Sequence, residues 1–174
     1  KFEGVPGVGA EFFDAGHILG SSITVMDIEE KGRKIRFAFS GDLGRKETPI
    51  LRDPTLIHDI DYLIMESTYG DKNHKSREEA QSQLRKIVGE AVDRGGKIII
   101  PSFAVGRAQE LIYSLHFMME SGALPKFPIY VDSPLAVNVS KLFRKHSEIQ
   151  DETAREFADE MKTDVLNFPE VTYV

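Results

Sequence analysis

The chain has 174 residues, of which 41% are hydrophobic and 29% are charged, and its formal net charge is −6. This length suffices for one ordinary domain or for parts of two larger ones, and the acidic balance disfavours a dedicated nucleic-acid-binding module, which is usually basic. It does not exclude a nuclease, because bound divalent cations would supply local positive charge. The absence of cysteine excludes disulfides and thiolate ligands, so any metal must bind to His and carboxylate side chains.

The sequence shows no segment for export or membrane insertion. Its apolar runs are only a few residues long, and its first residues lack the apolar stretch of a signal peptide. We therefore expect no membrane partner and a cytoplasmic location. The first residue is not methionine, so we also expect the chain to be a piece of a longer protein.

The first region, up to about residue 70, has the pattern of short strands separated by glycine turns. The predicted strands cover residues 11–14, 23–28, 34–40 and 62–65. In the third of them, Ile35, Phe37 and Phe39 alternate onto one face, and residues 30–33 before it are typical of a hairpin turn. The run 62–65 is continuously apolar, which favours a strand buried on both faces. This half is expected to be part of a β-sheet layer.

The second region, from about residue 76, alternates helix and strand. The predicted helices cover residues 76–95, 108–122, 133–145 and 150–162, and the predicted strands cover residues 97–100 and 128–131. Ser76 and Glu79 have the spacing of a capping box, and Ser133 followed by Pro134 predicts a helix cap and first position. Such alternation favours a parallel sheet with crossover helices.

Three short motifs follow strand ends in the first region. They are Ala-Gly-His-Ile-Leu-Gly-Ser at residues 15–21, Ser-Gly-Asp-Leu-Gly at 40–44 and Glu-Ser-Thr-Tyr-Gly at 66–70. A histidine (His17) and an aspartate (Asp42) presented from separate strand ends suit a zinc-type hydrolytic site. Taken singly, these residues and Glu66 also have plain structural explanations, namely a hydrogen-bonded histidine, an Asp-Gly turn and a solvated strand end.

The second region has two segments suited to an anionic ligand. Residues 102–106 and 132–133 each lie after a predicted strand and before a helix, where open α/β sheets bind ligands and helix N-termini favour phosphate. The guanidinium of Arg107 could bind a phosphate with two hydrogen bonds. The alternatives are an internal salt bridge for Arg107 and a purely capping role for Ser133.

In this order, the three motifs resemble those of the β-CASP family of the metallo-β-lactamase superfamily. The family includes the endonuclease of the pre-mRNA cleavage and polyadenylation machinery and archaeal and bacterial RNA-processing nucleases. The resemblance continues through residues 100–110 and 130–136 and covers about residues 10–145. It implies an α/β chain in which residues 1–72 are part of a metallo-β-lactamase β-sandwich. Residues 73–174 would be part of a β-CASP domain, with a parallel sheet flanked by helices.

The resemblance also implies the roles of individual residues. His17 resembles a residue that binds one of two zinc ions, and Asp42 resembles the carboxylate that bridges both ions. Glu66 resembles a group that orients a ligating histidine. These three residues are expected to carry catalysis, with His17 and Asp42 as metal ligands. The expected substrate contacts are Arg107, Ser133, Tyr69 and Ser102. The implied activity of the parent protein is hydrolysis of RNA phosphodiester bonds, with both metals stabilising the developing charge.

The sequence departs from the family in its ligand set. The family's His-x-His-x-Asp-His motif and its later histidine motifs are absent, and His146 matches neither. Two ligands do not hold two zinc ions tightly, so these residues alone are expected to be inactive.

Two alternatives stay open. One is a catalytically silent RNA-binding or scaffold paralogue, against which the three intact site residues argue. The other is a small-molecule hydrolase of the metallo-β-lactamase fold, which residues 102–107 and 132–136 disfavour. The expected partners are RNA and either a second copy of the chain or the subunits of an RNA-processing complex.

Overall fold

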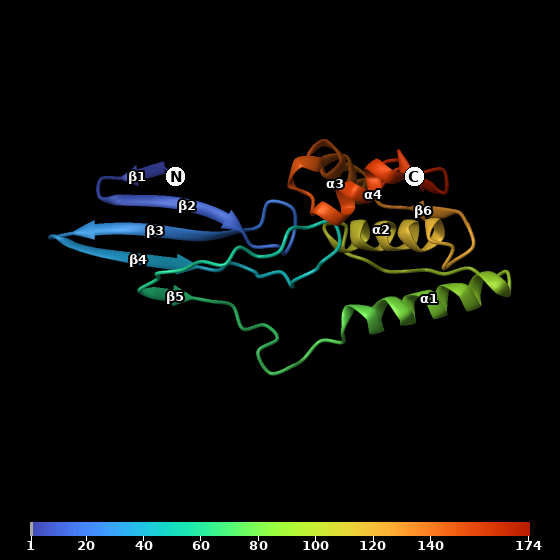
Figure 1. Ribbon diagram of the computed structural model, residues 1–174, viewed down its shortest axis with the longest axis horizontal. Coiled ribbons are helices and arrows are strands. Elements are labelled where there is room, and N and C mark those ends of the chain that lie inside the picture. Colours follow the sequence, from blue (N-terminus) through green and yellow to red (C-terminus); the bar gives the residue numbers. More distant parts are fainter. Residues whose placement is uncertain (1) are drawn as a thin grey trace. The chain divides into compact units, whose positions relative to one another are not determined.

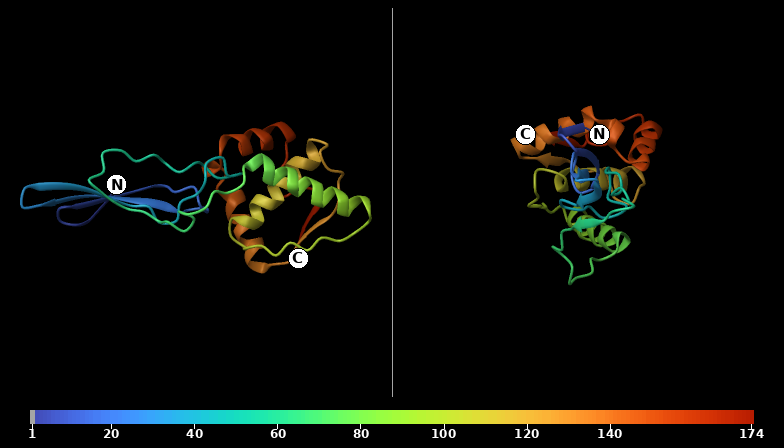
Figure 2. Two further views of the ribbon diagram at one scale, coloured as in Figure 1. Left: turned by 90° about the horizontal axis from the view of Figure 1, so that it is seen from below. Right: turned by 90° about the vertical axis from the view of Figure 1, so that its left-hand side faces the viewer.

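The computed structural model describes residues 2–174, and the chain divides into two compact units. The first unit ends at Gly70 and contains one five-stranded sheet, and the second unit, Asp71–Val174, contains four α-helices and a two-stranded sheet (Figures 1 and 2). The predicted α/β class is therefore confirmed. The first unit shows only one sheet within the described residues, so the predicted sandwich is not seen there.

The sheet of the first unit follows the chain order. Its strands are β1 (Phe2–Val5), β2 (Val8–Asp14), β3 (Ser22–Glu30), β4 (Arg33–Phe39) and β5 (Tyr62–Ile64). β1 to β4 are antiparallel and β5 pairs in parallel with β4. The four strands predicted here are confirmed, and β1 is an additional one. The hairpin turn between β3 and β4 is also confirmed, because Lys31 and Gly32 have φ of 51° and 76°, as the favoured mirror-image turn requires.

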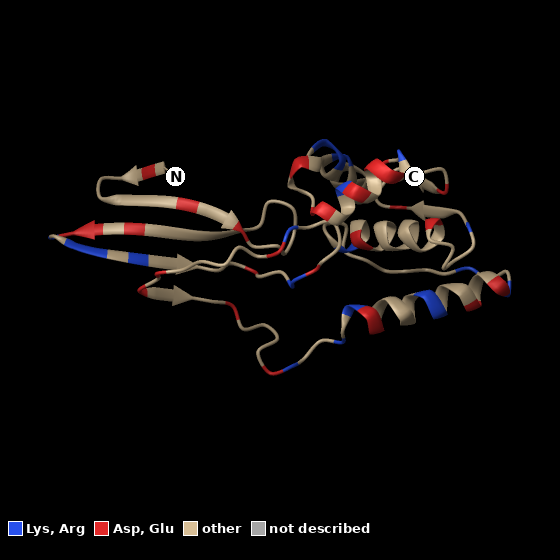
Figure 3. Ribbon diagram, viewed as in Figure 1, with Lys and Arg blue, Asp and Glu red and all other residues tan. Residues whose placement is uncertain are grey.

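Opposite charges face each other across the β3–β4 hairpin (Figure 3). Glu29 pairs in register with Lys34, and their side chains form an ion pair of 3.8 Å. Asp27 pairs with Arg36 at 3.9 Å in the same way. Cross-strand pairs of this kind favour one register over its neighbours, although exposed pairs contribute little to overall stability.

Only one face of this sheet is well covered. Ala15, Ile23, Val25 and Ala38 form its core, with parts of the following loops packed on them. On the opposite face Phe12, Phe39 and Ile64 are 59%, 47% and 54% exposed. Ile35, Phe37 and Phe39 share a face as predicted by their alternation, yet the buried residue of β4 is Ala38 on the other face.

The prediction of a doubly buried strand at residues 62–65 was wrong. β5 is an edge strand that pairs only with β4, and all three of its residues are exposed. A continuous apolar run therefore gave the right element but the wrong environment, since burial depends on layers that a strand's own sequence does not specify.

The second unit is mainly helical. Its elements are α1 (Arg77–Asp93), α2 (Arg107–Glu120), β6 (Ile129–Val131), α3 (Pro134–Lys145), a 3₁₀ turn (Ser147–Ile149), α4 (Glu152–Met161) and β7 (Val171–Tyr173). The capping box of Ser76 and Glu79 is confirmed, with both of its reciprocal hydrogen bonds present. Ser133 caps α3 and Pro134 occupies its first turn, also as predicted. α2 lies between α1 on one side and α3 with α4 on the other (Figures 1 and 2).

The parallel sheet of this unit is smaller than predicted. β6 pairs in parallel with β7, and α3 and α4 form the crossover between them. The strand predicted at residues 97–100 was wrong, because no neighbouring strand pairs with this segment and Ile99 is 90% exposed. β7 has only three residues and lies beyond the strands predicted from the sequence.

None of the helices within residues 2–174 combines the length and the apolar character needed to cross a lipid bilayer. The longest helix, α1, has 17 residues, and many of them are charged.

Candidate functional site

The three sequence motifs of the first unit are joined by hydrogen bonds. The His17 segment follows β2, the Asp42 segment follows β4, and Glu66 lies two residues after β5. The backbone N–H of Leu43 donates to the Glu66 carboxylate at 2.9 Å. The N–H of Gly44 donates to the carbonyl oxygen of Ala15 at 2.8 Å. The structure thus brings together the histidine, aspartate and glutamate motifs that the sequence singled out.

The close approach of two of these segments depends on Gly44. A Cβ at this position would overlap the carbonyl group of Gly16 and lie 2.7 Å from the backbone nitrogen of His17. The atoms in the way are backbone atoms, which cannot rotate aside as a flexible side chain can. The segment carrying Asp42 therefore reaches the segment carrying His17 only because residue 44 has no side chain.

Ser21 fixes the conformation of the histidine segment. Its hydroxyl accepts hydrogen bonds from the N–H groups of His17 at 3.1 Å and Ile18 at 3.2 Å. Its carbonyl oxygen accepts a further bond from Ala15. These bonds hold the backbone in a tight turn while the imidazole of His17 is exposed.

Glu66 forms more hydrogen bonds than the other candidate residues. Its carboxylate accepts hydrogen bonds from the hydroxyl and N–H of Thr68 and from Leu43, and these bonds, with the nearby His17, hold the pKa of Glu66 below its usual value. Its own N–H donates to the hydroxyl of Ser40, which is buried. Glu66 is therefore an ionised acceptor near neutral pH. Sequence reasoning missed Ser40 and Thr68, although both hydroxyls stand inside the motifs.

The side chains of His17 and Asp42 are exposed. Within residues 2–174 neither the imidazole nor the Asp42 carboxylate has a hydrogen-bond partner, so no protein group competes for their lone pairs. An imidazole and a carboxylate are donors that zinc accepts. In the same part of the chain, no three His, Asp or Glu side chains gather closely enough to hold a metal ion. Among the described residues, His17 and Asp42 are therefore two candidate donors without a third such side chain beside them.

The predicted substrate contacts fall in both units. Tyr69 is exposed in the first unit, and Ser102, Arg107 and Ser133 belong to the second. Arg107 forms an ion pair of 2.6 Å with Glu110, but its side chain is 56% exposed. The hydroxyl of Ser133 accepts a hydrogen bond from the N–H of Ala136 at 3.2 Å. Both structural explanations considered for Arg107 and Ser133 thus hold, and more than half of the Arg107 side chain still faces solvent.

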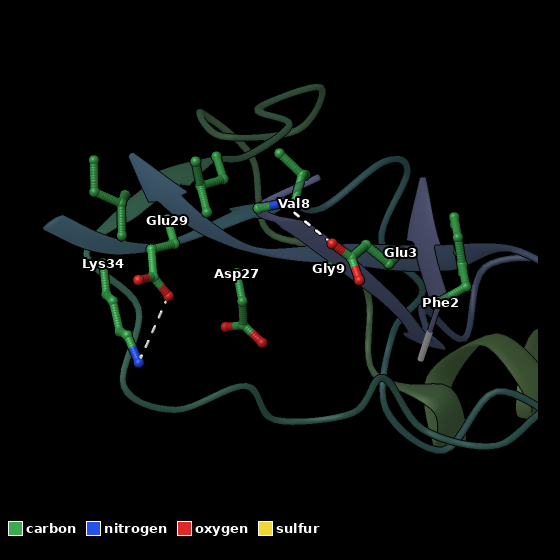
Figure 4. Close-up of a pocket in the computed structure, with 10 residues that line it drawn as sticks. Phe2, Glu3, Val8, Gly9, Asp27, Glu29 and Lys34 are labelled. Carbon is green, nitrogen blue, oxygen red and sulfur yellow. Dashed lines mark hydrogen bonds and ion pairs between the residues drawn. The ribbon is translucent and has the colours of Figure 1, made fainter. Parts of the chain in front are cut away.

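An open groove elsewhere on the first unit carries no sign of this chemistry (Figure 4). It lies near the hairpin ends and is lined by residues such as Phe2, Val8, Asp27 and Lys34. None of the three motif residues contributes to it. The candidate site is therefore described by its converging loops and lies outside this groove.

Comparisons with known proteins agree with the motif pattern. The model of the Beta-Casp domain matches residues 108–174. The chain is 41% identical over 132 residues to a ribonuclease of Thermus thermophilus, covering 76% of this chain and 29% of that protein. It is 39% identical over 127 residues to an RNase J-like protein of Methanocaldococcus jannaschii, covering 72% and 30%. It is 32% identical over 151 residues to cleavage and polyadenylation specificity factor subunit 3 of Dictyostelium discoideum, covering 86% and 19%.

These matches place the chain in the metallo-β-lactamase superfamily. Within it, the chain belongs to the β-CASP family, so the resemblance drawn from the motifs is confirmed. The chain spans less than a third of the length of these curated relatives.

Proposed function

We propose that the protein to which this chain belongs is a zinc-dependent ribonuclease that hydrolyses RNA phosphodiester bonds. The observation that carries the proposal is the convergence of three motif segments through the bonds from Leu43 to Glu66 and from Gly44 to Ala15. The names of the relatives, which include a ribonuclease and an RNase J-like protein, support RNA as the substrate.

His17 and Asp42 are the residues of this chain that would hold the metal. Their donor atoms are exposed while their backbone is fixed by neighbouring hydrogen bonds, which reduces the entropy lost when a metal binds. When bound, a pair of zinc ions supplies Lewis-acid stabilisation of charge on the phosphodiester. Two protein ligands do not hold two ions tightly, so residues 1–174 alone would be inactive.

Glu66 would act through its negative charge and its fixed position. The hydrogen bonds from Thr68 and Leu43 leave the carboxylate ionised near neutral pH, and His17 is close enough to stabilise that charge. An ionised carboxylate next to a metal site accepts a hydrogen bond from a ligating imidazole and fixes its orientation. We assign this positioning role to Glu66.

The second unit would contribute contacts to the RNA backbone. The Arg107 side chain stays 56% exposed beside its ion pair with Glu110, and an RNA phosphate could bind the guanidinium or displace the glutamate. Ser133 and Ser102 would add hydroxyl contacts, and Tyr69 in the first unit offers an exposed ring on which a base can stack.

The test is cleavage of a 5′-labelled single-stranded RNA by the natural full-length protein and by its Asp42→Asn variant. We expect the variant to lose at least about a hundredfold in kcat/KM, since the amide is a much poorer metal ligand than the carboxylate. Glu30→Gln, which removes an exposed charge on the β3–β4 hairpin, is the matched control and should keep its activity. Equal activity of the Asp42→Asn variant and this control would refute the proposal.

A further inference from the structure

A strained turn precedes the second helix. Gly106 has φ of 80° and ψ of −71°, and the N–H of Arg107 donates to the carbonyl oxygen of Val105 at 3.1 Å. These values describe a classic γ-turn, a rare and strained backbone conformation. Glycine makes this turn accessible because its positive φ meets no Cβ clash, and the surrounding contacts then hold the conformation. The turn leads directly into Arg107, the first residue of α2 and a proposed RNA contact.

One buried amide side chain holds this turn. Gln109 is 0% exposed, and its Oε1 accepts the N–H of Gly106 at 2.9 Å. Its Nε2 donates to the carbonyl oxygen of Ala104 at 3.2 Å and to the hydroxyl of Ser140 at 3.0 Å, and approaches the carbonyl oxygen of Ala136 at 3.5 Å. A single side chain therefore binds the segment before α2 on one side and α3 on the other.

We propose that Gln109 is a positioning residue for RNA binding, and this inference rests on the proposed function. Both the oxygen and the nitrogen of its amide form hydrogen bonds, so neither the γ-turn nor α3 can shift without leaving a buried polar group unpaired. The amide thereby fixes Arg107, directly after the turn, relative to Ser133, which caps α3. Gln109 itself contacts no RNA, because it is completely buried.

The hydrogen bond of Gln109 to the γ-turn distinguishes a positioning role from a role in filling the core. A residue needed only to fill the core could be replaced by an apolar side chain of similar volume at small cost. Methionine has about the volume of glutamine but offers no donor to Ala104 and no strong acceptor to Gly106. The Gln109→Met variant should therefore keep the core filled while the turn relaxes and Arg107 changes direction.

The experiment measures kcat and KM for cleavage of a 5′-labelled single-stranded RNA of 20 nucleotides by the natural full-length protein. Gln109→Met should raise KM by about five- to tenfold with kcat within twofold, because it misplaces a binding group and not the reacting groups. In an Arg107→Ala background the same change should have little further effect on KM, since both substitutions remove one contact. Ser140→Ala removes one hydrogen-bond partner of Gln109 and leaves the bond between Gly106 and Gln109, so it should give a smaller rise in KM. This variant replaces Gln109→Met in the test if Gln109→Met does not fold.

A fall in kcat at unchanged KM, or full additivity with Arg107→Ala, would overturn the inference. If Arg107→Ala alone leaves KM unchanged, the proposed RNA contact of Arg107 fails and the role of Gln109 fails with it. Loss of all cleavage by Asp42→Asn in the same assay would still support the proposed function.

Discussion

Substitution of Gly44 by alanine should separate the two segments that carry His17 and Asp42. The new methyl group would overlap the carbonyl of Gly16 and lie 2.7 Å from the backbone nitrogen of His17, so the segments must move apart. Overpacking of this kind costs typically about 1–3 kcal/mol. Loss of the 2.8 Å bond from Gly44 to Ala15 leaves a polar group unpaired and adds about 1–3 kcal/mol. We therefore expect a total loss of roughly 2–6 kcal/mol in the free energy of unfolding of the first unit.

The assay is urea unfolding followed by circular dichroism, with the Gly4→Ala variant as control. Gly4 lies in β1 of the same unit, and the nearest atom to its added methyl group would be Phe2 Cε2 at 4.0 Å, an ordinary contact. The control should change stability by less than about 1 kcal/mol. If Gly44→Ala were as stable as Gly4→Ala, the close approach of the two motif segments would be refuted.

Three further predictions concern single side chains. Thr68→Val should raise the pKa of Glu66 toward its usual value of 4.5, because it removes the hydrogen bond that lowers that pKa most. NMR titration of the Glu66 carboxyl carbon measures this pKa, and an unchanged value would contradict the prediction. Burial lowers the pKa of His116 below 6.5, so the unfolded chain binds this proton more readily and the folded state loses stability as the pH falls below about 6.5. Between about pH 7.5 and 5.5 the melting temperature of His116→Gln should therefore drop less than that of the unchanged protein. An equal drop in both proteins would disprove the link. Ser133→Ala should lower stability by about 1 kcal/mol through loss of the α3 cap, whereas a neutral effect in thermal unfolding would show the cap to be unimportant.

The local elements of the fold were predictable because their causes are local. Ser76 and Glu79 form their capping box within one helical turn, and Lys31 with Gly32 forms the hairpin turn within four residues. Strand pairing is not local in this way. The apolar run 97–100 lacks a neighbouring strand within residues 2–174, whereas β7 pairs with β6, which lies about forty residues earlier in the chain.

In the candidate site, too, the local motifs could be predicted and the contacts between distant segments could not. The motif order singled out His17, Asp42 and Glu66 as candidates, and the structure joins their segments by hydrogen bonds. What holds them could not be deduced, since Leu43 and Glu66 are 23 residues apart and Gln109 and Ser140 are 31 residues apart. Such bonds depend on how strands and helices pack. A polar residue such as Gln109, next to Glu110 on a helix, gives no sequence signal that it is buried.

The metal content of the natural full-length protein tests the central claim most directly. Mass spectrometry of the purified protein should find two zinc ions per chain, and fewer in the Asp42→Asn variant, with RNA cleavage falling as zinc is lost. The isolated residues 1–174 should retain neither ion tightly, because His17 and Asp42 are the two ligands that the proposal assigns among the described residues 2–174. Tight binding of two zinc ions by these residues alone, or full zinc content and full RNA cleavage in the Asp42→Asn variant, would contradict this account.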